Sequence, residues 1–164
     1  MALCDWPRWI FASAADYFKE IANDEDLPVL VEGLEERTKT FMESADRAEI
    51  RITGPFMEEL SRGYWRVYMD VSVLLTSRFD GPKKNAYDLY KYAGAIAAAM
   101  DTDIEVWNFG SEPGDYTDVP STQIKLGCLK LQKGVTVVHF GQTDVTAKVK
   151  QCEVNAKYQM EVTE

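Results

Sequence analysis

The sequence has few of the residues on which most catalytic and metal sites depend. Its 164 residues include one histidine, His139, and three widely spaced cysteines, Cys4, Cys128 and Cys152. A single imidazole excludes the zinc-protease motifs that need two histidines, and it leaves room for one catalytic triad at most. Three cysteines without a C-x-x-C pair argue against a disulfide framework and favour a reducing compartment.

Long apolar runs and an excess of basic residues are also missing. Because no stretch of about 18 apolar residues exists, no membrane-spanning helix is expected. The first six residues lack a basic region, so they do not resemble a signal peptide. The chain carries 27 acidic and 18 basic side chains, a formal net charge of -9. Specific nucleic-acid binding is therefore not expected, because phosphates are held by clustered Lys and Arg.

The acidic excess lies mainly in the first third of the chain. Residues 1–62 hold 14 acidic and 7 basic side chains, whereas residues 63–164 hold 13 and 11. The composition is otherwise that of a folded protein, with 46% hydrophobic and 12% aromatic residues. Together with the length, this predicts one domain, residues 1–164, with a substantial core.

Hydrophobic periodicity predicts two main helices, over residues 5–22 with Asp5 as N-cap and over residues 85–100. Extended segments are predicted over residues 27–33, 48–53, 64–76, 104–109, 124–131, 135–140 and 145–162. Residues 34–45 are predicted to form a loop or a weak helix, and residues 56–62 a short helix or turn. In the last extended segment the apolar positions change from odd to even near Lys150 and Gln151, which predicts a bulge or turn there.

This order of elements lacks the regular βαβ alternation of a parallel sheet. It predicts an α+β fold, in which a mostly antiparallel β-sheet is flanked by two main helices in a single domain.

No motif points to a catalytic, metal or cofactor site. The sequence contains no Walker loop, no G-x-G-x-x-G and no G-x-S-x-G, and His139 ends an apolar segment with no partner at a recognisable spacing. Two carboxylate groups are dense enough to suggest a cation, but neither has the pattern of an EF-hand loop: Asp101, Asp103 and Glu105, and then Glu112, Asp115 and Asp118. We therefore expect no enzyme, no cofactor and no metal. Asp101 and Asp103 are expected to meet a basic partner, in this subunit or in another.

Several segments together carry a family resemblance. They are Leu-Pro-Val-Leu-Val-Glu-Gly at 27–33, Ala-Glu-Ile-Arg-Ile-Thr-Gly-Pro at 48–55, the extended segment at 63–75, the following loop and alanine-rich helix, and Val-Asn-Ala-Lys-Tyr-Gln-Met-Glu-Val at 154–162. In these segments the chain resembles the small structural proteins of tailed-bacteriophage virions, most nearly the tail terminator, or tail completion, proteins of long-tailed phages. The likeness is one of element order and size over nearly the whole chain.

The resemblance implies a structural virion protein in the tail or neck, assembled in the host cytoplasm and not bound to membranes. It implies a homohexameric ring that caps the tail tube, contacts the tail tube protein and joins the head connector. DNA would pass through the ring without specific binding. An acidic protein suits this role, because a conduit must repel its cargo. Residues 1–62 are then the first place to look for the lumen.

Other functions remain open from the sequence. The chain could be a tail tube or neck adaptor subunit, or a tube-related protein of a secretion system. A small enzyme that uses the acidic loop 110–122 is the alternative from another class. Segments 34–45 and 110–122 have no counterpart in the resemblance.

Two loops, 77–84 and 110–122, are predicted to carry contacts between subunits. Each displays an aromatic residue among polar neighbours, as interface anchors often do, and solvated loops are the alternative. The residues predicted to lie at the interface are Phe79, Asp80, Asp115, Tyr116 and Asp118.

Overall fold

The computed structural model describes residues 5–79, 87–108, 124–142 and 148–163, and the side chains of all these except 141 and 142. The helices are α1 (Trp6–Asp24), α2 (Lys39–Glu43) and α3 (Tyr87–Met100). The strands are β1 (Val29–Val31), β2 (Asp46–Ser61), β3 (Tyr64–Arg78), β4 (Ile104–Trp107), β5 (Lys125–Leu131), β6 (Thr136–Gln142) and β7 (Val149–Thr163).

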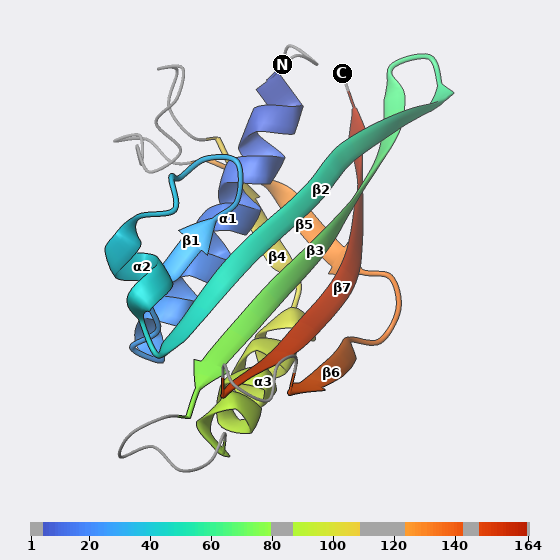
Figure 1. Ribbon diagram of the computed structural model, residues 1–164. Coiled ribbons are helices and arrows are strands. Elements are labelled where there is room, and N and C mark those ends of the chain that lie inside the picture. Colours follow the sequence, from blue (N-terminus) through green and yellow to red (C-terminus); the bar gives the residue numbers. More distant parts are fainter. Residues whose placement is uncertain (1–4, 80–86, 109–123, 143–147, 164) are drawn as a thin grey trace.

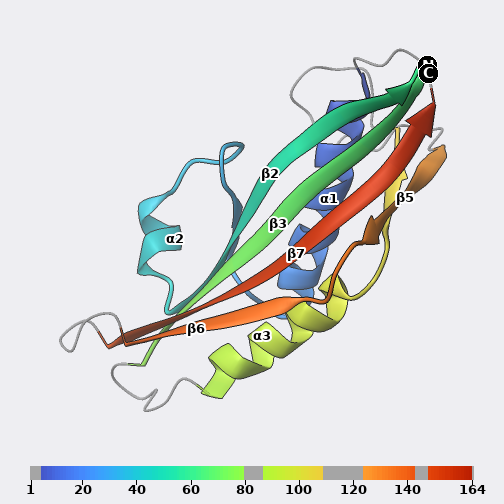
Figure 2. The same ribbon diagram turned by 90° about the vertical axis from the view of Figure 1, so that its right-hand side faces the viewer.

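All seven strands belong to one sheet, which curls into a half-barrel (Figures 1 and 2). The strand order is β1-β2-β3-β7-β5-β4, and β6 pairs with β7 alone. Only β1 and β2 are parallel. The predicted α+β fold, a single domain with a mostly antiparallel sheet and two main helices, is confirmed.

The strand β7 organises the sheet. One of its edges pairs with β3 along its whole length, from Val149 to Thr163. Its other edge pairs first with β6, opposite Lys150–Asn155, and then with β5, opposite Tyr158 and Gln159. β6 and β5 therefore lie one after the other along the same edge, and β5 turns away to pair with β4.

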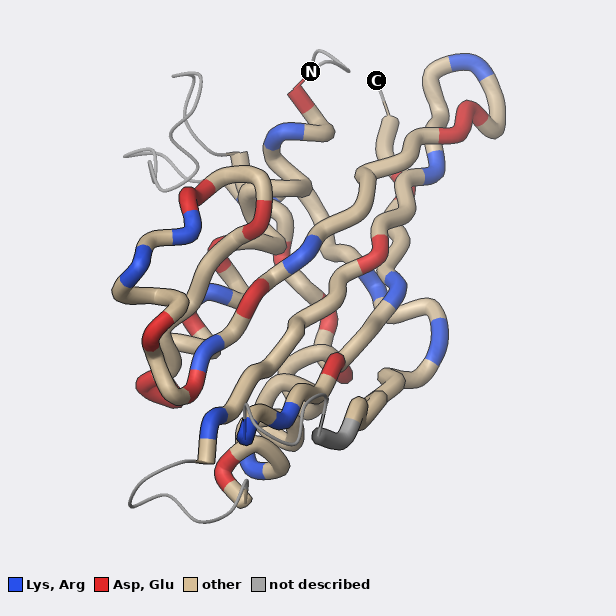
Figure 3. Tube along the Cα trace, in the orientation of Figure 1, with Lys and Arg blue, Asp and Glu red and all other residues tan. Residues whose placement is uncertain are grey.

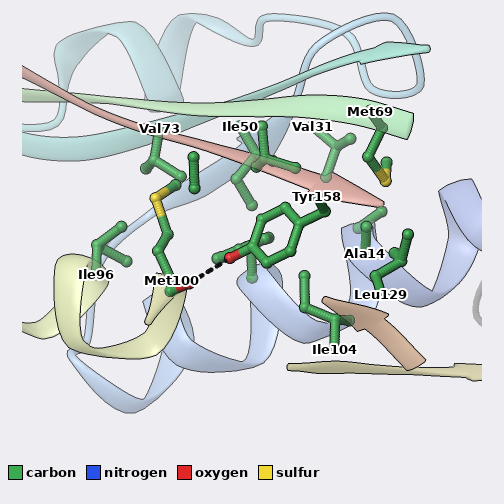
Figure 4. Packing of buried hydrophobic residues seen from close by; sticks show 14 of the residues in the cluster. Ala14, Val31, Ile50, Met69, Val73, Ile96, Met100, Ile104, Leu129 and Tyr158 are labelled. Atoms are coloured by element: carbon green, nitrogen blue, oxygen red, sulfur yellow. Dashed lines mark hydrogen bonds between the residues drawn. The ribbon is translucent and has the colours of Figure 1, made fainter. Parts of the chain in front are cut away.

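The core lies between the curled sheet and the two long helices. The inward positions of β3 and β7 alternate strictly, as in Val71 and Val73 or Val154 and Ala156, and they pack against α1 and α3. Tyr158 is the largest fully buried side chain, and its hydroxyl donates a 2.7 Å hydrogen bond to the Met100 carbonyl at the end of α3 (Figure 4). This bond joins the centre of the sheet to α3.

One predicted element is wrong. Residues 56–61 do not form a short helix or turn, because β2 continues to Ser61 and pairs with β3 up to Tyr64. A register shift between Thr53 and Phe56 moves the inward positions from even to odd numbers, and this shift hides the strand from a simple alternation test. Gly54 makes the irregularity possible, since its φ is +104° and an added Cβ would lie 3.0 Å from the Phe56 amide nitrogen.

The bulge or turn predicted near Lys150 and Gln151 lies at a different position in the structure. The turn lies at Lys148, with φ of 45°, and β7 then runs from Val149 in unbroken register with β3. The irregularity opposite Gln151 belongs to the partner strand, as a register shift between His139 and Gly141 in β6. Residues 145–147 of the predicted segment lie outside the described ranges.

Other boundaries agree closely with the prediction. Asp5 stands at the N-cap position of α1, but its side chain makes no capping hydrogen bond and instead pairs with Arg8 at 3.4 Å. Pro28 precedes β1, which is an edge strand as its proline predicts. Within the described ranges, no helix is both long enough and apolar enough to cross a membrane.

Replacing Tyr158 with phenylalanine tests the link between the sheet and α3. The change removes the hydrogen bond and leaves the Met100 carbonyl unpaired in the core, which should lower the free energy of unfolding by about 1–3 kcal/mol at neutral pH. Urea unfolding measures this, and Tyr68→Phe, at an exposed position, is the control.

The wild type and Tyr158→Phe should also differ in how their stability depends on pH. Burial, reinforced by Tyr17 and by Asp101 and Asp103, raises the pKa of Tyr158 well above the ordinary value of 10.0. The folded protein therefore holds this proton more tightly than the unfolded chain, and the wild type should lose stability as the pH rises above about 10. Tyr158→Phe lacks this loss, so the difference between the two proteins should shrink there. An equal difference at pH 7 and pH 11 would contradict the burial of an intact hydroxyl.

Candidate interaction surfaces

The outer edge of β1 is closed by the chain itself. The Val31 amide donates a 2.9 Å hydrogen bond to Glu35 Oε2, and the Val31 carbonyl accepts from the amides of Leu34 and Glu35. Lys19 of α1 holds the Glu35 carboxylate from the other side. A neighbouring strand could not pair with Val31 without displacing this turn.

The outer edge of β4 is closed in a different way. The Trp107 amide donates a 3.0 Å hydrogen bond to the Ser13 hydroxyl of α1, 94 residues away in the sequence. The helix packs along β4, so this edge is covered as well. Ser13 is buried, and its position in an otherwise apolar helix face is explained by this bond.

No strand pairs with the outer edge of β6 within the ranges that the structure describes. This strand has no charged residue and no proline, the usual protections of an edge. Its apolar side chains are exposed: Val138 by 38%, and Phe140 by 48%. His139 is exposed too, with its ring centroid 4.9 Å from that of Tyr90 on α3. The β6 edge therefore combines exposed backbone with exposed apolar groups, as interaction surfaces do.

The outward face of the sheet is polar and supports itself by cross-strand contacts. Lys157 Nζ lies 3.6 Å from Asp70 Oδ2, and Arg66 lies 3.6 Å from Glu161. Such exposed pairs contribute little stability, so their main effect is to keep this face solvated. Near the β2–β3 turn, the rings of Phe56 and Tyr68 lie 5.8 Å apart on the same face.

An acidic stripe runs along the outer side of α1. Asp16, Glu20 and Asp24 are exposed and follow one another at four-residue spacing, so they lie on one helix face. A cavity of about 280 Å³ separates the first part of this stripe from β4. It is lined by Ser13, Asp16, Tyr17, Glu20, Asp103, Glu105 and Trp107. The Asp16 carboxylate is partly desolvated where it borders this cavity, which raises its pKa, and the attraction of Lys19 opposes this effect only in part.

Three other carboxylates lie near the stripe. Of these, Glu105 pairs with Lys125. Asp101 and Asp103, for which a basic partner was expected, form no ion pair with any residue in the described ranges. No group of three or more His, Cys, Asp or Glu in that part of the chain is arranged to hold a metal ion.

Of the five residues predicted at the interface, only Phe79 falls in a described range. It follows β3 and is partly buried against the core, with Lys150 Nζ 5.6 Å from its ring centroid. Its amide donates to the Lys148 carbonyl at 3.0 Å. Asp80, Asp115, Tyr116 and Asp118 lie outside the described residues, so their interface role stays a prediction.

The cysteines occupy two different environments. Cys152 is fully buried on the inward face of β7, and burial raises the pKa of its thiol. Cys128 is half-buried on β5, where it borders a cavity with Met160 and Lys130. Cys4 is outside the described ranges.

The comparisons with known proteins identify no family. No protein-family model matches the chain, and no curated protein matches it. One solved structure that carries no functional name aligns with 90% of this chain and 92% of its own length, at 9% sequence identity and a TM-score of 0.46. This likeness is too distant to carry an argument about function.

Replacing Asp16 with asparagine tests the unmatched charge of the stripe. Because the pKa of Asp16 is raised on folding, its carboxylate opposes folding at neutral pH, and the substitution should raise the melting temperature slightly. The gain should disappear as the pH falls below the ordinary value of 3.8, where the carboxyl is protonated in both states.

Asp70→Asn is the matched control, because the Asp70 carboxylate pairs with Lys157. It should give no such gain at pH 7. Destabilisation by Asp16→Asn at pH 7 would contradict an unfavourable charge at this position.

Proposed function

We propose that this protein is a structural virion protein, a ring-forming tail terminator at the junction between a phage tail tube and the head connector, which lines a DNA channel. The observation that carries the proposal is the contrast between the sheet edges. The chain seals the edges of β1 and β4 with its own groups, and leaves β6 uncharged, apolar and, within the described ranges, uncovered. Such an edge suits a subunit that is completed by association.

The acidic stripe supports the role of a conduit. Like charges at four-residue spacing weaken a helix by about 0.2–0.5 kcal/mol per pair, yet α1 carries two such pairs in succession, Asp16 with Glu20 and Glu20 with Asp24. A surface of carboxylates repels the phosphates of DNA and prevents them from adhering. A channel lined by this stripe would let DNA pass without holding it.

The arrangement of the elements suits a ring. In Figure 1, α1 lies behind the sheet, β1 and α2 lie at its left side, and β6 lies at its lower right side. If α1 faces the lumen, the left and right sides face neighbouring subunits, and the polar face of the sheet points outward. Homohexameric packing and contacts with the tail tube protein and the neck proteins belong to this proposal.

A subunit at a neighbouring position in the virion would use the same surfaces. A tail tube subunit or a neck adaptor would also form rings around DNA, and differs in the proteins that bind above and below the ring. The loop 110–122, on which the enzymatic alternative depends, lies outside the described residues.

The proposal predicts a ring of defined size. Analytical ultracentrifugation at tens of micromolar should show a species of six 18.6 kDa chains, and negatively stained particles should show rings with a central hole. The wild type should not retain double-stranded DNA at low salt. A triple variant, Asp16→Lys, Glu20→Lys and Asp24→Lys, should retain DNA in a salt-dependent way, because it places cations along the channel.

A chain that stays monomeric across the whole concentration range would contradict the ring. Rings whose DNA binding is unchanged by the triple variant would instead show that α1 does not face the lumen.

A further inference from the structure

The two lateral sides of the molecule differ in the charges that form no ion pair with a described residue, and Figure 3 marks the charged positions along the chain. On the β6 side, residues 124–142 and 148–163 contain six lysines against two acidic residues, Glu153 and Glu161. Lys130, Lys133 and Lys148 are exposed there and form no ion pair with any described residue. This side of the molecule is therefore basic, although the protein as a whole is acidic.

The opposite side is formed by residues 24–43, which run from the end of α1 through β1 to the end of α2. This segment contains seven acidic side chains against only Arg37 and Lys39. Arg37 is already engaged by Glu32 and Glu49, and Lys39 by Glu43. Glu35 pairs with Lys19, Glu32 also with Arg51, and Glu25 with Lys91. The carboxylates of this segment that form no ion pair with a described residue are those of the exposed Asp24, Asp26 and Glu36.

Each side also exposes apolar groups beside its charges. On the basic side these are Val137, Val138 and Phe140 of β6. On the acidic side they are Leu34, exposed by 46%, and Met42, exposed by 40%. Apolar contacts surrounded by complementary charges are the usual composition of a protein interface.

We propose that the β6 side of one subunit docks onto residues 24–43 of a second copy of this chain, head to tail. This inference rests on the proposed ring and names its contact surfaces. The complementary charges of the two sides favour a second copy of this chain as the partner, and they favour the head-to-tail arrangement. A two-fold contact of β6 with β6 would bring two lysine-rich sides together, whereas the head-to-tail contact brings a basic side to an acidic one.

A head-to-tail contact is the kind of contact from which rings are built. It uses two different surfaces of each subunit, so every added copy exposes a free surface for the next one, and the assembly is a ring where the rotation between subunits closes and a filament where it does not. The two surfaces lie on opposite sides of the sheet (Figures 1 and 2). Asp16 and Glu20 of the acidic stripe lie outside the contact segment and can face the centre of the ring.

A charge-exchange experiment tests this pairing. The first variant, Lys130→Glu with Lys133→Glu, reverses the charge at two exposed positions of the β6 side. The second variant, Glu36→Lys with Glu43→Lys, reverses the charge at two exposed positions of the 24–43 side. In each variant alone, the two introduced charges would face unchanged charges of the same sign, so association should weaken at least tenfold.

The decisive measurement is the mixture of the two variants. The two introduced glutamates of the first variant meet the two introduced lysines of the second, and the wild-type sides of the two also match, so an equimolar mixture should recover rings. A chain with all four substitutions should assemble by itself. The matched control, Glu58→Lys with Arg62→Glu at the β2–β3 turn, should assemble like the wild type.

Circular dichroism melts ensure that each variant is folded before its association is measured. A second variant tests the apolar part of the contact: Val138→Asp should weaken association, and Leu60→Asp, at a hairpin position of similar exposure, should not. Sedimentation gives the association constants.

Three results would overturn the proposed contact. If the two double variants assemble as well as the wild type, this interface is wrong while the ring stands. If both lose assembly and neither the mixture nor the fourfold variant recovers it, the head-to-tail pairing is wrong. If the wild type itself never assembles, the ring and its interface fail together.

Discussion

Every backbone amide and carbonyl along a sheet edge bonds to the protein, to a partner or to water, and the surfaces of this protein follow from which of these each edge uses. At β1 the partner is the Glu35 carboxylate, and at β4 it is the Ser13 hydroxyl. At β6 the described residues provide none on the outer side. Two edges are thus closed against pairing with a further strand, and the third is left available to it.

Because the sheet is curled, the closed edges and the open edge lie on different sides of the molecule. The buried Tyr158 and the alternating residues of β3 and β7 hold the sheet around α1 and α3. This packing fixes α1 on one face, the polar cross-strand pairs on the other, and β6 and residues 24–43 at opposite sides. The composition shows only a net negative charge. The fold arranges the charged residues into an acidic stripe on α1 and two sides with different charge.

The pattern of apolar residues is sufficient to predict most of the fold. Strict alternation identifies β3, and four-residue spacing identifies α1 and α3. Alternation fails in β2, because the register shift after Thr53 exchanges inward and outward positions within one continuous strand. It also misplaces the start of β7, where the turn at Lys148 resets the phase.

The candidate surfaces are less predictable, for a physical reason. The lack of charge in β6 can be read in the sequence, but its place at an edge depends on which strand pairs with β7. The bond between Ser13 and Trp107 joins residues 94 positions apart, and no local pattern indicates it. Net charge likewise predicts repulsion of DNA, but only the fold separates the acidic stripe from the basic side.

The most direct test is hydrogen–deuterium exchange of residues 136–140 in dilute and in assembled protein. If β6 is the edge that association covers, its outward amides exchange quickly in the dilute subunit and become at least tenfold slower in the ring, while the amides of β3 stay protected in both. Unchanged exchange in β6 upon assembly, or equal protection of β6 and β3 in the isolated subunit, would contradict this.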